Sequence, residues 1–203
     1  MGSYTNGNGK PRRVCVFCGS NPGARPEYET AAQEMGRALV DRGLGLVYGG
    51  GRAGLMGTVA DAVLDAGGEV IGVIPEALMG KEVGHRELTE LHVVDTMHTR
   101  KAMMADMASA FVAMPGGFGT FEEICEVITW SQLGFHPKPC GLLNIRGFYD
   151  PMLALFDHAV AEGFVKQAHR EMVLVENDPN RLLCRFERFV PATVGKWIGR
   201  AEH

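Results

Sequence analysis

In the segment Ala110-Phe-Val-Ala-Met-Pro-Gly-Gly-Phe-Gly-Thr120 an apolar run passes through a glycine-rich turn into a helical pattern. Ala110–Met114 is apolar throughout, which is typical of a strand buried on both faces. Thr120–Leu133 then repeats its apolar residues at helical spacing. A strand, a tight turn and a helix in this order form half of a parallel βαβ unit.

The same alternation runs along the whole chain. The predicted strands are Arg13–Cys18, Leu44–Tyr48, Glu69–Ile74, Leu91–Val94, Ala110–Met114, Gly141–Leu143 and Met172–Val175. The predicted helices are Glu27–Arg42, Gly54–Ala66, Thr99–Ala108, Thr120–Leu133, Met152–Glu162 and Pro179–Phe186. This pattern predicts an α/β fold, a single-domain Rossmann-like doubly wound parallel sheet with helices on both faces.

The length of 203 residues suits one domain with one large core. We expect this domain at residues 12–190, after a flexible or added tail at 1–11 and before a C-terminal tail at 191–203. No stretch approaches the roughly 20 apolar residues of a membrane helix. The first ten residues lack the apolar core of a signal peptide. The expected location is therefore cytoplasmic, with no membrane partner.

Composition narrows the classes of ligand. A net charge of −4 argues against a general nucleic-acid binder, which is usually basic. A small anion remains compatible with that charge, because loops and helix ends bind phosphate locally. The 27 glycines are unusual for this length, and they cluster at the ends of apolar runs. That placement indicates functional turns.

Five cysteines, an odd number without a scaffold spacing, fit a reducing compartment better than a disulfide framework. Cys15 and Cys18 form a C-x-x-C pattern inside a predicted strand, which favours buried thiols over redox or metal chemistry. The histidines show no spacing typical of metal ligands; those considered are His85, His92, His98 and His136. We therefore assign no metal.

Three glycine-rich turns follow predicted strands: Gly19-Ser20, Gly49-Gly-Gly51 and Gly116-Gly-Phe-Gly119. The carboxyl ends of parallel strands lie at one edge of the sheet, and ligands of such folds bind there. We therefore expect the three turns to form one site.

The segment Gly49–Gly54 satisfies G-x-G-x-x-G between a strand and a helix, so a dinucleotide site is one alternative. That site needs an acidic residue at the end of the following strand to hold the ribose. Glu69 has the right offset but opens its strand instead of closing it. Close packing of helix on strand is the simpler explanation for these glycines.

The turn Pro115–Thr120 is suited to a phosphate. Glycines let backbone N–H groups converge on an anion, and the helix that begins near Thr120 adds its positive dipole end. The G-K-[ST] ending of a triphosphate-binding loop is absent, so a monophosphate fits better.

Glu123 follows Thr120 by three residues, and two interpretations stay open. In a capping box, T-x-x-E, the glutamate only satisfies a backbone N–H. Alternatively, a carboxylate one turn into the helix reaches the sugar of a nucleotide whose phosphate lies on the turn. For Glu122, pairing with the helix dipole is the favoured role.

Arg100 and Lys101 open the helix Thr99–Ala108, where cations oppose the helix dipole. A purely structural role predicts them poorly, although solvated surface charge remains the alternative. A guanidinium suits contact with a carboxylate, a phosphate or a leaving-group nitrogen. Apolar residues also recur at helical spacing, which favours core packing or paired helices of two subunits: Met103, Met104, Met107, Ile124, Val127, Ile128 and Trp130.

From Val14 to Val175 the sequence resembles the LONELY GUY (LOG) family of cytokinin-activating phosphoribohydrolases, once loosely labelled lysine decarboxylases. The segments that carry the resemblance are Val16–Ser20, Val47–Gly51, Gly54–Gly57, Gly72–Pro75, Met97–Lys101, Pro115–Glu123 and Glu126–Trp130. The signature P-G-G-x-G-T-x-x-E is complete. The resemblance implies hydrolysis of the N-glycosidic bond of N6-substituted adenosine 5′-monophosphates to free base and ribose 5-phosphate.

The resemblance also implies the site residues. The family's catalytic arginine and glutamate correspond to Arg100 and Glu123. The implied substrate-binding residues are Gly19, Ser20, Gly51, Glu82, Met97, Arg100, Lys101, Gly116, Gly117, Phe118, Gly119, Thr120, Phe121, Glu122, Glu123 and Thr129. It further implies no cofactor or metal, and a homodimer with active sites near the subunit interface.

The preferred N6 group and the hydrolysis of plain AMP stay open. So do two alternatives, an NAD(P)-dependent oxidoreductase and a non-catalytic nucleotide-binding protein. Loss of Arg100 or Glu123 would be the clearest sign of the latter, and both residues are present.

Overall fold

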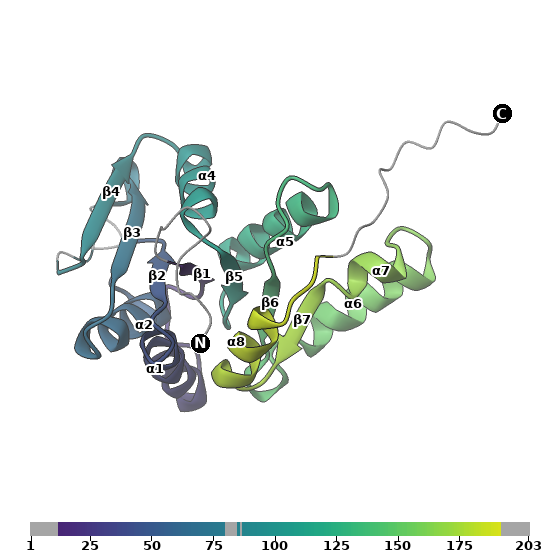
Figure 1. Cartoon of the computed structure of the whole chain (residues 1–203), viewed down its shortest axis with the longest axis horizontal. Helices are drawn as coiled ribbons and strands as arrows, with labels where there is room; N and C mark the ends of the chain where they lie inside the picture. Colours follow the sequence, from purple (N-terminus) through teal and green to yellow (C-terminus); the bar gives the residue numbers. More distant parts are fainter. Residues whose placement is uncertain (1–11, 80–84, 86, 192–203) are drawn as a thin grey trace.

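Seven parallel strands form one sheet in the order β4-β3-β2-β1-β5-β6-β7, with helices on both faces (Figure 1). The computed structural model describes residues 12–79, 85 and 87–191. The strands are β1 (Arg13–Phe17), β2 (Gly45–Tyr48), β3 (Val70–Pro75), β4 (Glu90–Val94), β5 (Ala110–Ala113), β6 (Cys140–Leu143) and β7 (Val173–Glu176). The predicted fold class is confirmed.

The helices connect successive strands. They are α1 (Pro26–Val40), α2 (Gly54–Asp65), α3 (Glu76–Met79), α4 (Met97–Met107), α5 (Phe118–Gln132), α6 (Asp150–Ala161), α7 (Gln167–Arg170) and α8 (Pro179–Glu187), with a short 3-10 turn η1 (Ile145–Gly147). The pattern did not predict α3, α7 and η1, because segments of three or four residues are too short to show a period. None of the helices in the described ranges is long and apolar enough to cross a bilayer.

The direction in which strands are added reverses at β1. From β1 the chain adds β2, β3 and β4 outward on one side, and β5 then returns to pair with β1 on its other side. The register of that central pair places Val14 beside Ala110 and Phe17 beside Ala113. The turns after β1 and β5 therefore emerge side by side, at the switch point where ligands bind in such sheets.

Two hydrophobic cores cover the two faces of the sheet. Val14 and Val16 of β1 face the core that includes α1, α2 and α8. Cys15 and Phe17, one step out of phase, face the core that includes α4 and α5. This alternation follows from strand geometry, in which successive side chains point to opposite faces. The two helices that carry the predicted catalytic residues, α4 and α5, therefore share one face.

The starts of those two helices differ from the prediction by two residues each. α4 begins at Met97, because the Thr96 hydroxyl accepts a hydrogen bond from the Thr99 N–H (3.0 Å) and caps the helix. α5 begins at Phe118, directly after Gly117 in an extended conformation. Both shifts move the helix N-termini closer to the ends of the strands. The expected domain limits remain a prediction, since residues 1–11 and 192–203 lie outside the described ranges.

Candidate functional site

The three glycine-rich turns meet at the carboxyl edge of the sheet, as the sequence predicts. The Gly19 N–H donates to the Pro115 carbonyl (3.0 Å), which joins the turn after β1 to the turn after β5. The turn after β2 reaches the same place, because a Cβ on Gly54 would lie 2.4 Å from the backbone nitrogen of Asn21. A cleft of about 280 Å³ opens there.

Most of the predicted site residues line this cleft: Gly19, Ser20, Met97, Arg100, Gly117, Phe118, Gly119, Thr120, Glu122 and Glu123. Five other predicted site residues do not line the cleft: Gly51, Lys101, Gly116, Phe121 and Thr129. Glu82 lies outside the described residues. A groove of about 420 Å³ between α1 and α2 holds none of the predicted residues.

Sequence reasoning missed part of the wall, which also includes Val16, Phe17, Cys18, Gly49, Met56, Leu78 and Met104. Gly49 belongs to one of the turns that the sequence analysis expects at the site, and Cys18 directly precedes another, so their positions offer a signal. The apolar members offered none, because a methionine or leucine at helical spacing has the same pattern whether it packs in a core or lines a cleft.

The N-terminus of α5 faces the cleft through Gly117, Phe118, Gly119 and Thr120. The first N–H groups of a helix have no acceptor within the helix and carry its positive dipole end. Gly116 makes the tight approach possible, because a Cβ there would lie 2.2 Å from the Thr120 hydroxyl oxygen. This helix start is suited to bind an anion.

The capping-box interpretation of Thr120 and Glu123 is wrong. Gly117 is the N-cap of α5, so Thr120 lies inside the helix and cannot cap it. Glu123 is 8% exposed, and its carboxylate accepts a hydrogen bond from Arg100 of α4. The error arises because the pattern marks the first helical turn only when the helix starts where the threonine stands.

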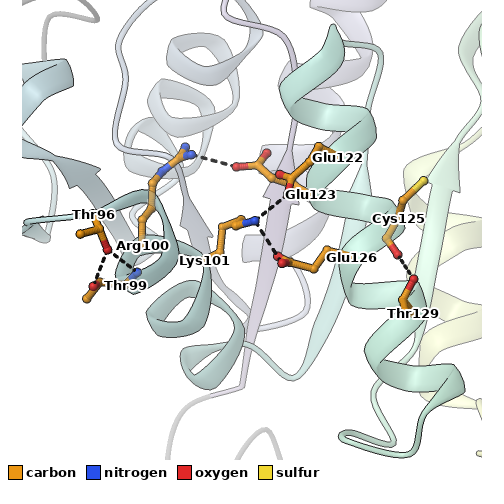
Figure 2. Close-up of polar contacts among 9 residues, drawn as sticks. All are labelled: Thr96, Thr99, Arg100, Lys101, Glu122, Glu123, Cys125, Glu126 and Thr129. Atoms are coloured by element: carbon orange, nitrogen blue, oxygen red, sulfur yellow. Dashed lines mark hydrogen bonds and ion pairs between the residues drawn. The ribbon is translucent and has the colours of Figure 1, made fainter.

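Arg100 and Glu123 form a buried ion pair across the two helices, and their side chains point toward one another (Figure 2). The distance from Arg100 Nη1 to Glu123 Oε1 is 2.9 Å, and Arg100 Nε donates to the Val73 carbonyl at 3.1 Å. Arg100 is only 7% exposed, so its interpretation as solvated surface charge is wrong. Taking two charges out of water is costly, which points to a functional role for the pair.

Gly49 provides the space that the guanidinium occupies. A Cβ on Gly49 would lie 2.0 Å from Arg100 Nη2. Any side chain at this position would therefore displace Arg100. The first glycine of the G-x-G-x-x-G segment thus serves close packing on an arginine, and Gly54 serves close packing on the backbone of Ser20 and Asn21.

The dinucleotide alternative also loses its acidic residue. Glu69 precedes β3 and accepts two hydrogen bonds from Arg13, at 2.6 and 3.0 Å. Arg13 opens β1, so this ion pair lies at the amino edge of the sheet, opposite the turns. Glu69 is therefore not placed to hold a ribose at the Gly49–Gly54 turn.

Lys101 joins the same two helices at a second point (Figure 2). Its Nζ lies 2.5 Å from Glu122 Oε1 and 3.0 Å from Glu126 Oε1. Burial alone would lower the pKa of Lys101, but the hydrogen bonds and charges of Glu122 and Glu126 outweigh it, and the pKa is raised. Lys101 is therefore directed at two glutamates. Glu122 pairs with this lysine in addition to its predicted interaction with the helix dipole.

Thr129 lies farther along α5 and is exposed. Its hydroxyl donates to the Cys125 carbonyl of its own helix (2.7 Å), as Figure 2 shows. The structure therefore does not bring Thr129 to the cleft.

The cysteines behave as buried thiols. Cys15 and Cys18 are free and buried, and burial raises the pKa of both. A raised pKa keeps a thiol protonated and unreactive near neutral pH. Within the described ranges, no cluster of three or more His, Cys, Asp or Glu residues could hold a metal ion.

Known proteins match both the sequence and the fold. A family model described as "Possible lysine decarboxylase" matches residues 56–186. In Oryza sativa subsp. japonica, the "Probable cytokinin riboside 5'-monophosphate phosphoribohydrolase LOGL9" is 55% identical over 180 residues, covering 89% of this chain and 79% of that protein. The "Cytokinin riboside 5'-monophosphate phosphoribohydrolase LOG" of the same plant is 52% identical over 180 residues, covering 89% and 74%.

Among solved structures, the molybdenum cofactor carrier protein of Chlamydomonas reinhardtii has a TM-score of 0.65 at 20% identity, covering 87% of this chain and 96% of that one. Similarity at that level shows a shared fold alone. Identity above one half to the plant enzymes, along most of both chains, shows much more. The chain belongs to the LONELY GUY (LOG) family.

Proposed function

We propose that this protein hydrolyses the N-glycosidic bond of N6-substituted adenosine 5′-monophosphates, releasing a free cytokinin base and ribose 5-phosphate. The observation that carries the proposal is the buried Arg100–Glu123 pair, which lies in the cleft just inside the N-terminus of α5. The LOG relatives of this protein are named for this activity and are identical to it at just over half of the 180 aligned positions.

The 5′-phosphate binds at the start of α5. The N–H groups of Phe118, Gly119 and Thr120 belong to the first turn, and together with the helix dipole they favour a compact dianion. Glu123 lies three residues, a rise of about 4.5 Å along the helix, beyond Thr120. That spacing suits a phosphate on the turn and an anomeric carbon beside the carboxylate.

Glu123 acts at the sugar. As the C1′–N9 bond breaks, its electron pair leaves with the adenine ring and positive charge develops at C1′ and the ring oxygen. The carboxylate stabilises this charge and directs a water molecule, whose oxygen bonds to C1′. The departing base takes up one proton of that water, so the products are the neutral base and ribose 5-phosphate.

Arg100 holds the carboxylate in place. Its guanidinium is fixed by the Val73 carbonyl through Nε and meets Glu123 through Nη1. A planar fork anchored at two points restricts the orientation of Glu123 more than a lysine would. We assign AMP as a second substrate, because the proposed positions of the phosphate and the sugar do not depend on the N6 group.

The test is a comparison of three substrates: isopentenyladenosine 5′-monophosphate, its riboside and AMP, with chromatography for the free base. The monophosphate is expected to be cleaved about 100-fold or more faster than the riboside, since the phosphate contacts position the sugar. Equal cleavage of the riboside would contradict the phosphate site. Tight binding of the monophosphate without release of base would favour the non-catalytic alternative.

A homodimer is the second part of the proposal. Large apolar side chains are exposed on and after α5 and α6, with exposed fractions from 52% to 91%: Phe118, Leu133, Phe135, Leu155 and Phe164. α6 has no buried residue and lies beside β7, toward one end of the molecule in Figure 1. Large apolar side chains exposed on neighbouring elements are candidates for a protein interface.

The oligomeric state can be measured by light scattering after size exclusion. We expect twice the mass of one chain, and a monomer for the double variant Leu155→Glu, Phe164→Glu. A wild-type monomer at micromolar concentration would contradict the dimer.

A further inference from the structure

His85 is a buried histidine that the proposed reaction does not use. It lies between α3 and β4 and is 1% exposed. Its backbone N–H donates to the Gly50 carbonyl (3.1 Å), and its Nε2 lies 2.7 Å from Asp61 Oδ1 of α2. His85 therefore links the turn after β2 to α2, the helix that follows this turn.

The contacts of the imidazole define its hydrogen positions. The Glu87 N–H donates to His85 Nδ1 at 3.4 Å, which makes Nδ1 an acceptor. In a neutral imidazole the other nitrogen then carries the hydrogen, so Nε2 donates to Asp61. Each polar atom of the buried ring has a partner, and the ring is held in one orientation.

The turn that His85 holds is the one on which Arg100 rests. Gly49 precedes Gly50, and a Cβ on Gly49 would lie 2.0 Å from Arg100 Nη2. The other two nitrogens of the guanidinium are fixed by Val73 and Glu123. Gly49 thus forms the third side of the guanidinium slot, and a shift of this turn would move Arg100 relative to Glu123.

We propose that His85 is a positioning residue for the reaction. With Asp61 as its anchor, it fixes the Gly49–Gly50 turn and so keeps the guanidinium of Arg100 aligned with Glu123. It touches no substrate. The inference rests on the proposed function, because it assumes that the Arg100–Glu123 pair carries the chemistry.

The chain offers a matched control in His136. Its Nε2 lies 3.0 Å from the Val127 carbonyl, and its Nδ1 accepts a hydrogen bond from the Lys138 N–H at 3.1 Å. It therefore bridges two segments with the same pattern of contacts as His85. It follows the C-terminal end of α5 and does not line the cleft. Removing either ring takes away a similar bridge, but only one bridge leads to Arg100.

The experiment compares His85→Ala, His85→Gln, Asp61→Ala and His136→Ala with wild type, using isopentenyladenosine 5′-monophosphate. We expect His85→Ala to lower kcat about 10- to 100-fold with KM within about threefold, since misplacement of a catalytic group by 1 Å has effects of this size. Gln can still donate to Asp61, so His85→Gln should recover part of kcat. Asp61→Ala should lower kcat less than His85→Ala, and His136→Ala should leave it unchanged per folded molecule.

A second readout does not depend on activity. The Arg100 Nε–H donates to Val73, so its exchange with solvent, followed by NMR, reports how firmly the guanidinium is held. We expect about tenfold faster exchange in His85→Ala and Asp61→Ala, and no change in His136→Ala.

Unchanged Arg100 exchange in His85→Ala, or a loss of kcat that matches the loss of folded protein, would overturn the proposal. If His85→Ala cannot be purified folded, Asp61→Ala tests the same link from the exposed end of the bridge, with the same criteria. The two conclusions can fail separately. If the wild-type protein cleaves none of the nucleotides, the proposed function is refuted. If His85→Ala still speeds the exchange of the Arg100 Nε–H in that case, the structural link between His85 and Arg100 remains.

Discussion

Two neighbouring sets of charged residues join α4 to α5, yet their surroundings differ. One is the pair Arg100–Glu123, and the other is Lys101 with Glu122 and Glu126. Arg100 and Glu123 are both buried and lie in the cleft. Lys101, itself 11% exposed, instead meets Glu122 and Glu126, which are 54% and 27% exposed. We call these three residues the outer cluster, of which only Glu122 lines the cleft. Consecutive residues on a helix point about 100° apart. A single step in sequence therefore takes a side chain of α4 from the cleft wall, at Arg100, to a position outside it, at Lys101.

The position of a cation in a helix does not by itself separate the two cases. A cation in the first turns of a helix opposes the dipole, and this argument applies equally to Arg100 and Lys101. Arg100 lies in the cleft, where no lysine or second arginine of the described residues joins it in the wall. For Lys101, two carboxylates on another helix account for the charge. The buried pair is expected to carry the catalysis, and the outer cluster to make a smaller contribution.

The largest expected effect comes from Glu123→Gln. The amide keeps the shape and an acceptor for Arg100, so the protein should fold, but it loses the negative charge that stabilises the sugar cation. We expect kcat to fall about 10³-fold or more. Steady-state assays with circular dichroism check both parts, and Glu126→Gln in the outer cluster is the matched control. Full activity of folded Glu123→Gln would remove the catalytic assignment.

Arg100→Lys should have the next largest effect. The charge is retained, but the fork that reaches both Val73 and Glu123 is lost. We expect kcat to fall about 100-fold. Kinetics with isopentenyladenosine 5′-monophosphate provide the measurement. If lysine serves as well as arginine, then the fixed orientation of Glu123 is unimportant.

Lys101→Met should have a modest effect. It leaves Glu122 and Glu126 without their shared cation, which we expect to cost about 1 kcal/mol of stability and to change kcat and KM less than about threefold. Thermal unfolding and kinetics measure the two quantities. A rise in KM as large as the loss in Arg100→Lys would show that Lys101 moves from the glutamates to contact the nucleotide, as the family resemblance implies.

Salt should have the smallest effect and should separate the two regions. Raising ionic strength from about 0.05 to 0.5 M screens exposed charges and leaves buried pairs nearly unaffected. The stability difference between wild type and Lys101→Met should therefore shrink with salt. The stability difference between wild type and Arg100→Lys should stay the same as salt is raised. Equal salt dependence in both would contradict the contrast in burial.

Much of the fold follows from sequence because its signals are local. Each strand is a short apolar run, and glycines end several of them, so Leu44–Tyr48 and Ala110–Met114 were placed within a residue of β2 and β5. Helix starts were less accurate. Thr120 looks like a cap but lies inside α5, whereas Thr96 caps α4 through a hydroxyl that the apolar pattern does not reveal.

The site was predictable where a turn or the family signature marks it, as at Gly117–Thr120, Arg100 and Glu123. It was not predictable where the determining contact joins distant segments. The partner of Glu123 lies 23 residues away, and the apolar wall residues Met56 and Leu78 have the pattern of core residues. Only the packing of the sheet edge distinguishes these cases.

A double-mutant cycle can establish whether Arg100 and Glu123 act as one unit, as the proposed mechanism requires. The kcat/KM of Arg100→Gln, of Glu123→Gln and of the double variant would be measured on isopentenyladenosine 5′-monophosphate. Substitutions of residues that act together have strongly non-additive effects. The kcat/KM of the double variant should therefore be no more than about threefold below that of the less active single variant. Losses that multiply in the double variant would show that the residues act independently and contradict the account.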